Sequence, residues 1–423
     1  MSPAGRAVQP RGFASFRCLA ADCEDTCCSG WGVLVDRETF DKYRACADPE
    51  LRPRFDQFVQ IRDAEPTDNY YATLALSGTY CVFLSGGLCS IQERLGEEYL
   101  SRVCSTYPRV MNTVDGTLER SLDVSCPEAA RIVLLDREPM EVEAADAQST
   151  RLGYMSWMDT SAAEFHGTPF AYFPQVRELV LWLLRYRSLP LWQRLVVLGY
   201  FCDKLSELAH NGATEETPKI VDGYRQAVEN GLFYDSLRQY RAQPAKQLEI
   251  AAELLIDRIR AEYISPRLIE CHREFMQGVE WTGQSTLEGI AGRYADAARA
   301  YFLPFMKKNE HMMENYLSNY VYRTLFPFGA QKTERKLGLK AEDNTISHQY
   351  MLMMAYYALV RCLLVGMAGL HQSAFGADHV VKAVQTCARM FEHSFSAPGR
   401  ILETLAKHGL RTAESMALLI VDD

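Results

Sequence analysis

The chain has 423 residues, of which 48% are hydrophobic and 23% are charged, and its formal net charge at pH 7 is −9. This composition is typical of a globular protein with a sizeable core, and the length favours two or three domains over one. The excess of acidic residues argues against broad binding to nucleic acid or to anionic membranes, because both need clustered Lys and Arg.

The start of the chain carries no apolar run of the kind found in secretory signals, although it holds several arginines. Pro3 and Pro10 argue against an amphipathic targeting helix in the same stretch. We therefore expect a cytoplasmic protein. In that reducing compartment structural disulfides are rare, and clustered cysteines bind metal or do redox chemistry.

Cysteines are concentrated in the first third of the chain, where four of them fall within eleven residues. Thiolates are preferred ligands of Zn²⁺ and of iron–sulfur clusters. Cys46 is expected on a helix away from the others and is treated as a bystander. We predict that the remaining eight are metal ligands: Cys18, Cys23, Cys27, Cys28, Cys81, Cys89, Cys104 and Cys126.

The adjacent pair Cys27-Cys28 limits which metal these thiols could hold. Two neighbouring thiols cannot easily chelate one Zn²⁺ ion, so the pair favours a larger cluster or two centres that share the region. The spacing matches neither the ferredoxin run nor the CxxxCxxC triad. The preferred interpretation is an iron–sulfur cluster, with zinc as the alternative and a thiol-rich core without metal as a third reading.

Residues 1–138 form the predicted cysteine-rich domain, which mixes short strands and short helices. Asp36 is the expected N-cap of a helix that runs from Arg37 to Cys46. A Gly-Gly turn separates Cys81 from Cys89 and can bring the two sulfurs together. The other predicted elements are strands over 30–36, 70–76 and 118–125, a helix over 92–103, and a helix that opens at Cys126-Pro127 with Ser125 as its cap.

Residues 139–173 are acidic and then interrupted by Gly and Pro, so we place a linker there. From 174 to 423 the apolar residues recur with helical period, which predicts an all-α domain. The predicted fold class is therefore mainly α, a small cysteine-rich mixed module followed by a multi-helix domain. Helices are expected over 176–186 and 190–210 and from about 219, 246, 266, 286, 308, 345, 378 and 398.

The apolar stretch 350–370 is long enough to span a membrane. Arg361 lies near its middle and would be costly inside a bilayer, whereas the residues before it are ordinary helix caps. We therefore predict a buried helix of the bundle and no membrane span.

One stretch of the helical part, 314–328, is rich in Tyr and Asn. Asn315 and Asn319 are four residues apart and share one helix face, and Tyr316 and Tyr320 share the next. This surface forms either a polar, aromatic-walled cleft or ordinary packing inside the bundle. The sequence contains no Walker or Rossmann phosphate motif, no HExxH and no GxSxG.

Several motifs together resemble the flagellin lysine N-methylases over nearly the whole chain. In the first part these are Phe16-x-Cys18, Cys23-x-x-Thr-Cys27-Cys28-x-Gly-Trp31, Cys81-x-Phe-Leu, Gly-x-Cys89-x-Ile-Gln, Leu-Gly96-Glu, Cys104-x-x-Tyr-Pro108-Arg109 and Cys126-Pro-Glu-Ala-Ala. In the helical part they are Glu314-Asn-Tyr-x-x-Asn319-Tyr, Phe326-Pro327 and Phe391-Glu-His393. The first part alone is loosely similar to small cysteine-rich proteins that hold zinc or iron–sulfur centres.

The resemblance implies methyl transfer from S-adenosylmethionine to the ε-amino groups of surface lysines of flagellin, and a [4Fe–4S] centre held by the cysteines. We accordingly predict Asn315, Asn319 and Tyr320 as catalytic residues, because amides and a phenol can orient a neutral amine in a desolvated pocket. Tyr316 is predicted to contact S-adenosylmethionine, whose sulfonium suits an aromatic face.

Glu314 or Glu392 could accept the proton that the lysine must lose, and a water path would also serve. The alternative to an enzyme is a metal-stabilised protein-binding adaptor without catalysis. In either case the expected partner is flagellin or another protein, and not nucleic acid.

Overall fold

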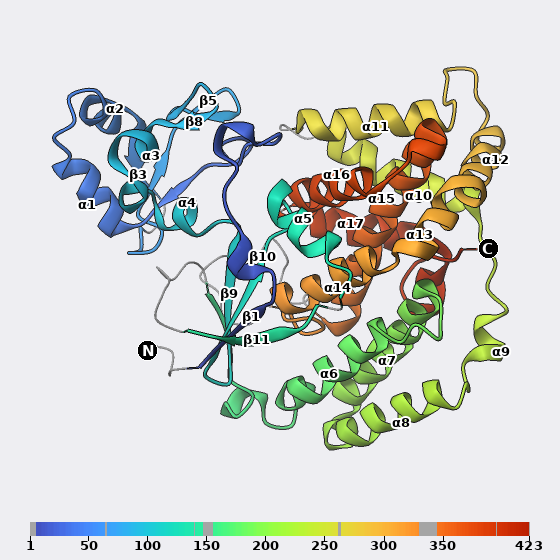
Figure 1. Ribbon diagram of the computed structural model, residues 1–423. Coiled ribbons are helices and arrows are strands. Elements are labelled where there is room, and N and C mark those ends of the chain that lie inside the picture. The colour runs from blue at the N-terminus through green and yellow to red at the C-terminus, as the bar shows by residue number, and fades with distance from the viewer. Residues whose placement is uncertain are drawn as a thin grey trace.

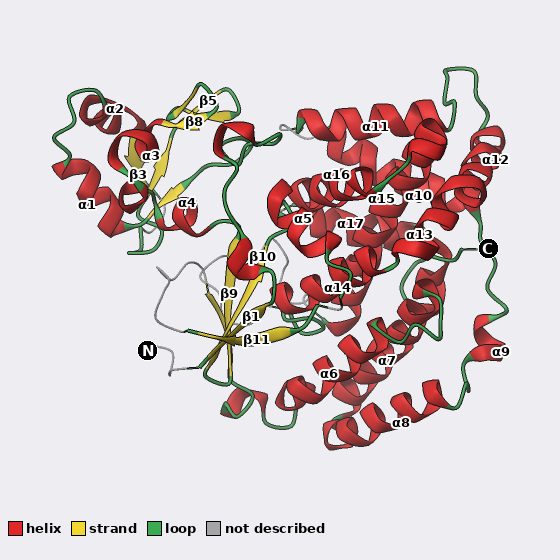
Figure 2. Ribbon diagram, viewed as in Figure 1, coloured by secondary structure: helices red, strands yellow, loops and turns green. Residues whose placement is uncertain are grey.

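The computed structural model describes residues 6–63, 66–138, 140–146, 155–260, 264–329, 345–394 and 396–422. Residues 147–154 of the predicted linker therefore lie outside the described residues. The chain is mainly helical, which confirms the predicted fold class, and all of its described strands lie before residue 159. Figure 2 shows these strands in two places, a small lobe and a larger sheet, beside a body built of helices.

The small lobe, residues 18–107, has a hydrophobic core of its own (Figure 1). Tyr43 and Phe55 stack in that core with their ring centroids 4.1 Å apart. Asp36 caps the first helix, as predicted, by accepting a hydrogen bond from the backbone N–H of Thr39. The helices of the lobe are η2 (Ala20–Asp22), α1 (Arg37–Ala45), α2 (Leu51–Phe58), α3 (Ser90–Leu95), η3 (Glu97–Tyr99) and α4 (Arg102–Thr106). Its strands are β2 (Leu34–Val35), β3 (Val59–Ile61), β4 (Ala72–Leu74), β5 (Leu76–Ser77), β6 (Tyr80–Cys81), β7 (Leu84–Ser85) and β8 (Leu88–Cys89).

The single helix predicted over 92–103 is wrong, because the chain breaks it twice. α3 ends at Leu95, where Gly96 follows with a φ of +88°, a conformation that residues with a Cβ rarely adopt. Ser101 then begins a new helix by accepting a hydrogen bond from the backbone N–H of Cys104. Cys104 therefore lies inside α4 and not at the end of a longer helix.

A five-stranded sheet packs against α14, and only one of its strands was predicted. β1 pairs in parallel with β10 and antiparallel with β11, so the start of the chain is built into the sheet. The range predicted as a linker contributes two strands, while its role as a domain boundary stays a prediction. In spatial order the strands are β11 (Val142–Ala145), β1 (Ala7–Pro10), β10 (Thr117–Leu122), β9 (Arg109–Val114) and β12 (Met155–Met158).

The helical body begins with α5 (Pro127–Leu135), whose N-cap is Cys126 and not the predicted Ser125. Apart from the two short ones that begin at Tyr234 and Ala413, which were not predicted, the later helices start within a few residues of the predicted positions. They are α6 (Phe173–Leu184), α7 (Leu191–Asn211), α8 (Thr217–Glu229), α9 (Tyr234–Leu237), α10 (Pro244–Ile259), α11 (Pro266–Gly278), α12 (Leu287–Ala297), α13 (Leu303–Asn309), α14 (His311–Thr324), α15 (Ile346–His371), α16 (Ala377–Cys387), α17 (Ala397–Lys407) and α18 (Ala413–Met416). Two segments have π-helical hydrogen bonding, η7 (Ala298–Phe302) and η10 (Ala388–Glu392).

Helix α15 runs through the middle of the body (Figure 1). Ile346–Ala374 is the one described helical stretch that is long and apolar enough to cross a membrane, and 94% of its apolar window is buried inside the protein. Arg361 is buried with it and is paired with Asp422, and it donates a hydrogen bond to the Tyr294 hydroxyl at 2.9 Å. These contacts are those of a core helix in a bundle, and the absence of a membrane span stays a prediction.

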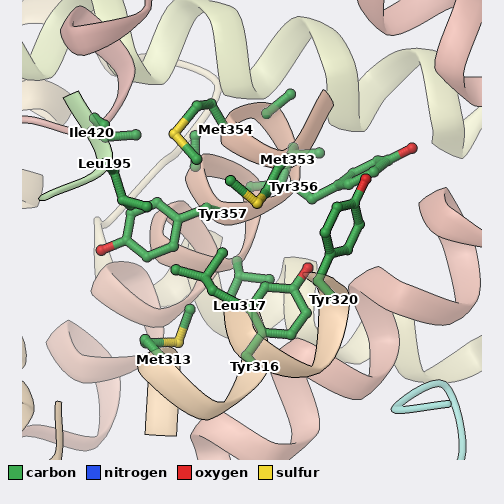
Figure 3. Close-up of a cluster of buried hydrophobic side chains, with 14 of the residues drawn as sticks. Leu195, Met313, Tyr316, Leu317, Tyr320, Met353, Met354, Tyr356, Tyr357 and Ile420 are labelled. Atoms are coloured by element: carbon green, nitrogen blue, oxygen red, sulfur yellow. The ribbon is translucent and has the colours of Figure 1, made fainter. Parts of the chain in front are cut away.

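The helix α14 lies directly against α15 in the core. Figure 3 shows Tyr316, Leu317 and Tyr320 of α14 facing Met353 and Tyr356 of α15. The rings of Tyr320 and Tyr356 are 6.1 Å apart at an angle of 58°, a tilted contact typical of aromatic packing. The aromatic residues predicted as a cleft wall thus form part of the core.

Candidate functional site

The predicted ligand cysteines fall into two groups according to which thiols interact electrostatically. The first thiol group lies on the core of the lobe and consists of Cys28, Cys81, Cys89 and Cys104. The second thiol group consists of Cys18, Cys23 and Cys126, the last of which packs on the core of the body. Cys27 interacts with members of both groups. Cys46 is buried in the lobe core.

Cys28 differs in electrostatic character from the other thiols of both groups, because burial raises the pKa of Cys81, Cys89 and Cys104. A hydrogen bond with the Cys27 thiol lowers the pKa of Cys28 to about 7, helped by the Thr26 hydroxyl and by the charge of Arg389 and opposed by burial. Burial raises the pKa of Cys126 to about 12. Because the thiolate is the form that binds metal, Cys28 is better prepared for ligation at neutral pH than Cys126 is.

The donor set fits the predicted metal group by its chemistry. The first thiol group supplies four soft sulfur donors from separate segments of the lobe, which suits Zn²⁺ or a [4Fe–4S] cluster and not a hard cation. Such a group would cross-link these segments when bound. Among the described residues, however, no three His, Cys, Asp or Glu side chains are placed so that they could hold a metal ion. The cluster and the zinc alternative therefore both stay predictions.

Side chains from the body bind the loop over residues 25–29, which carries Cys27 and Cys28 and is called the cysteine loop below. The Arg389 guanidinium pairs with Asp25 at 2.8 Å and donates hydrogen bonds to the carbonyls of Thr26 at 2.8 Å and Ser29 at 3.0 Å. Gln385 donates to Asp25 at 2.8 Å from the same side. The backbone that carries Cys27 and Cys28 is thus fixed to α16 and η10 at the junction of the lobe and the body.

The predicted catalytic amides are buried and bonded to the backbone on either side of α5. The Asn319 amide nitrogen donates to the Leu122 carbonyl at 2.9 Å, and that of Asn315 donates to the Asp136 carbonyl at 2.8 Å. The amide oxygen of Asn319 is buried and has no hydrogen-bonding partner within the described part of the chain. The side-chain oxygen of Asn319 therefore remains an unused hydrogen-bond acceptor. The amide nitrogens of Asn315 and Asn319 are both occupied by backbone carbonyls.

Tyr316 and Tyr320 are also buried, and neither lines an open surface. The Tyr316 hydroxyl donates to the Glu392 carboxylate at 2.7 Å. Burial raises the pKa of both tyrosines above the ordinary value, so both remain neutral phenols. The assignment of these residues as catalytic or cofactor-binding stays a prediction.

Both glutamates predicted as proton acceptors are buried and paired with arginine. Glu314 accepts hydrogen bonds from Arg187 at 2.7 Å and from Arg194 at 2.7 Å. Burial alone would raise the pKa of Glu314, but the two arginines lower it below its ordinary value. Glu392 is held by Arg323 and by Tyr316. Neither carboxylate is available to accept a proton from a substrate.

An imidazole and a carboxylate that the sequence did not pair meet beside Asn319. The Nε2 atom of His393 lies 2.7 Å from a carboxylate oxygen of Asp123, which directly follows Leu122 at the end of β10. Burial on its own would raise the pKa of Asp123, but the charges of His393 and Arg323 hold it well below its ordinary value. Asp123 is buried, whereas the His393 side chain is 30% exposed.

A cavity of about 500 Å³ lies elsewhere, between α10, α12 and α17. Trp281 and three acidic residues line it, but these acids are already paired: Glu249 with Lys246, Glu253 with Lys407, and Asp257 with Arg400. None of the residues predicted as catalytic or metal-binding contributes to its wall.

Asp123, Gln385 and Arg389 were missed by reasoning from the sequence. Asp123 offered one signal, an acid at the end of a strand-like run three residues before a cysteine. Gln385 and Arg389 offered none, because a polar residue on an amphipathic helix looks the same whether it faces solvent or another domain.

The fold is that of a thiol-rich lobe beside an all-α body. Side chains of the body, Gln385 and Arg389, bind the lobe at the cysteine loop. A family model described as the FliB lysine N-methylase C-terminal domain matches residues 177–419. This range is more than half of the chain and includes α14, α16 and η10. The chain belongs to the FliB lysine N-methylase family.

Curated relatives agree with this assignment. The lysine-N-methylase of Salmonella typhimurium is 29% identical over 136 residues, which are 31% of this chain and 33% of the relative. The flagellar biosynthetic protein FliU of Salmonella muenchen is 29% identical over 137 residues, which are 31% of this chain and 79% of that protein. The match thus spans about a third of the length of the Salmonella typhimurium enzyme. No solved structure matches the chain.

Proposed function

We propose that the protein is a lysine N-methyltransferase that transfers methyl groups from S-adenosylmethionine to surface lysines of flagellin in the cytoplasm. The observation that carries this proposal is that the family match covers the body elements which hold the cysteine loop and Asp123. We further propose that the first thiol group holds a [4Fe–4S] cluster, with zinc as the alternative.

The junction between the lobe and the body offers groups that suit a lysine amine as the acceptor of the methyl group. The buried, unbonded amide oxygen of Asn319 can accept a hydrogen bond from a neutral ε-amino group without adding charge. The phenols of Tyr316 and Tyr320 on the same helix are neutral, and burial near this helix disfavours a charged ammonium. A desolvated amine next to one free acceptor is a reasonable nucleophile for methyl transfer.

The test is a methylation assay with the full-length protein, purified without oxygen and analysed for iron and zinc. Incubation with purified flagellin and S-adenosylmethionine is expected to add methyl groups to flagellin lysines, detected by mass spectrometry of the digested product. Cys202→Ser serves as the matched control, because Cys202 is buried in the body away from both thiol groups. If metal-loaded wild-type protein leaves flagellin unmodified, the proposal of methyl transfer fails.

A second candidate is a metal-stabilised adaptor that binds flagellar protein without catalysis. One relative, from Salmonella muenchen, has the name flagellar biosynthetic protein, which supports a flagellar partner for such an adaptor. Calorimetry separates the two candidates. An enzyme binds S-adenosylmethionine in the absence of flagellin, whereas an adaptor binds flagellin and shows no heat with S-adenosylmethionine.

A further inference from the structure

A lysine side chain is protonated at neutral pH and must lose a proton before its nitrogen can attack a methyl group. The following inference rests on the proposed methyl transfer and concerns the group that takes this proton. Glu314 and Glu392 are excluded as acceptors, because each is 2% exposed and already bound by arginine. A proton acceptor needs a free lone pair that substrate can reach.

We propose that His393 is the general base of the reaction and that Asp123 is the positioning residue that orients it. The Asp123 carboxylate accepts the proton of Nε2 at 2.7 Å, which leaves Nδ1 as the unprotonated, accepting nitrogen of the ring. Within the described part of the chain Nδ1 makes no hydrogen bond, and the side chain is 30% exposed. A buried acid behind an exposed imidazole is the arrangement by which triads hold a base in one tautomer.

The position of His393 in the fold supports this role. It directly follows the π-helical segment η10, a type of helix defect that is frequent at functional sites. Asp123 directly follows Leu122, the residue that binds the Asn319 amide, so the base and the free amide oxygen flank the same strand end. Asn319 and His393 therefore bind consecutive residues at the end of β10, and of the two only His393 is exposed enough to meet a substrate amine.

Asp123 faces the imidazole, and two further charged groups lie next to this pair in the structure or along the chain. Asp123 is bonded to the imidazole from the end of β10, Arg323 lies 3.7 Å from the same carboxylate on the α14 side, and Glu392 precedes His393 in η10. Glu392 is neutralised by its pair with Arg323. One negative charge, that of Asp123, therefore remains beside the ring.

The proposed step conserves atoms and charge. The lysine ammonium gives one proton to Nδ1 of His393, which becomes an imidazolium stabilised by the Asp123 carboxylate. The neutral amine then uses its lone pair to form a carbon–nitrogen bond to the methyl carbon of S-adenosylmethionine. The carbon–sulfur bond breaks with its electron pair remaining on sulfur, so the products are methyl-lysine in its charged form and S-adenosylhomocysteine.

The test compares His393→Gln with a matched control, His371→Gln. His371 is also 30% exposed and also bonded to a carboxylate, that of Glu274 at 3.3 Å, but it lies at the end of α15. We expect His393→Gln to lower kcat at pH 7 by about 10²- to 10⁴-fold, the usual contribution of a general base. Raising the pH towards the lysine pKa, about 10.4, should recover part of the rate in this variant. His371→Gln should keep the wild-type kcat and pH profile.

Asp123→Asn gives a second, independent measurement. Without the carboxylate the imidazolium is less stable, so the acidic limb of the kcat profile should move to lower pH. Melting temperature, metal content and S-adenosylmethionine binding are measured for every variant, because a purely structural role would change them together with activity.

A folded, metal-loaded His393→Gln protein with wild-type kcat and an unchanged pH profile would overturn the proposal. An acidic limb that stays in place in Asp123→Asn would overturn it as well, even if His393→Gln does not fold. Failure of this inference and failure of the proposed function are distinguishable: in the first case wild-type protein still methylates flagellin, and in the second it does not.

Discussion

The lobe and the body of this protein are stabilised in different ways. The body has one continuous core around α15, and its buried charges are paired within it, as Arg194 is with Glu314 and Arg361 with Asp422. The lobe has a small core built from strands of two or three residues, and half of the predicted ligand cysteines lie on that core. Metal bound to these thiols would cross-link the short segments and add to the stability that the small core supplies.

Because they are stabilised differently, the lobe and the body should respond differently to the same perturbation. Loss of ligands or contacts in the lobe should unfold the lobe alone, while loss in the body should lower the stability of the whole helical part. The side chains that link them, such as Arg389 at the cysteine loop, bind backbone carbonyls and not core residues. The link positions the loop without merging the two cores.

The largest expected effect is that of removing the metal proposed for the first thiol group. A chelator, or the substitution Cys28→Ser, should release metal and abolish the hydrogen-exchange protection of the lobe, since structural metal contributes about 10 kcal/mol or more to such small modules. Protection of α15 should persist. Cys202→Ser, in the body, is the control and should keep both the metal and the hydrogen-exchange protection of the lobe. If the lobe stays protected after chelation, the lobe does not depend on metal for its stability.

The next largest effect is expected for Arg194→Met. Arg194 is fully buried and pairs with Glu314, which is 2% exposed, so its removal leaves a buried carboxylate with only Arg187 as partner. The expected loss of unfolding free energy is about 3–5 kcal/mol, measured by denaturant titration of the body. The control is Arg225→Met, whose partner Glu178 is exposed and whose loss should cost less than about 1 kcal/mol. If both variants lose the same unfolding free energy, burial of the Arg194–Glu314 pair does not explain the loss.

Acid should weaken the body through the same group. The pKa of Glu314 is lowered in the folded protein, so its contribution to stability is fully present above the unfolded value of about 4.3 and is lost as the pH falls below it. Glu314→Gln should therefore be less stable at pH 7 and should show a flatter decline between about pH 5 and pH 3. Thermal melts over this range measure the slope, and parallel curves for variant and wild type would argue against the linkage.

The smallest effect is expected for the same substitution, Ile→Val, made at one buried position in the lobe and at one in the body. Ile91 in the lobe and Ile401 in the body are both buried, at 1% and 2% exposure. Ile91→Val and Ile401→Val should each cost about 1 kcal/mol, because each removes one methylene from a packed core. Hydrogen exchange should assign the first loss to the lobe amides and the second to the body amides. Losses spread over both regions in either variant would show a single cooperative unit.

Sequence reasoning succeeded where local chemistry decides. The helices of the body were predictable because their apolar residues repeat with helical period and because Thr286 and Thr345 cap the helices that follow. The break at Gly96 and most of the five-stranded sheet were missed. Strands of four residues that pair with distant segments carry little local signal, since strand preference depends mainly on the neighbours.

Local sequence patterns alone predicted the helical body and a thiol-rich module in the first third of the chain. Only the tertiary structure decided that the thiols divide into two groups, that Asn315 and Asn319 bind backbone carbonyls, and that Asp123 faces His393 across 270 positions of the chain. The physical reason is that helix formation depends on residues three or four apart. Contacts between a loop and a distant helix depend instead on how the whole core packs.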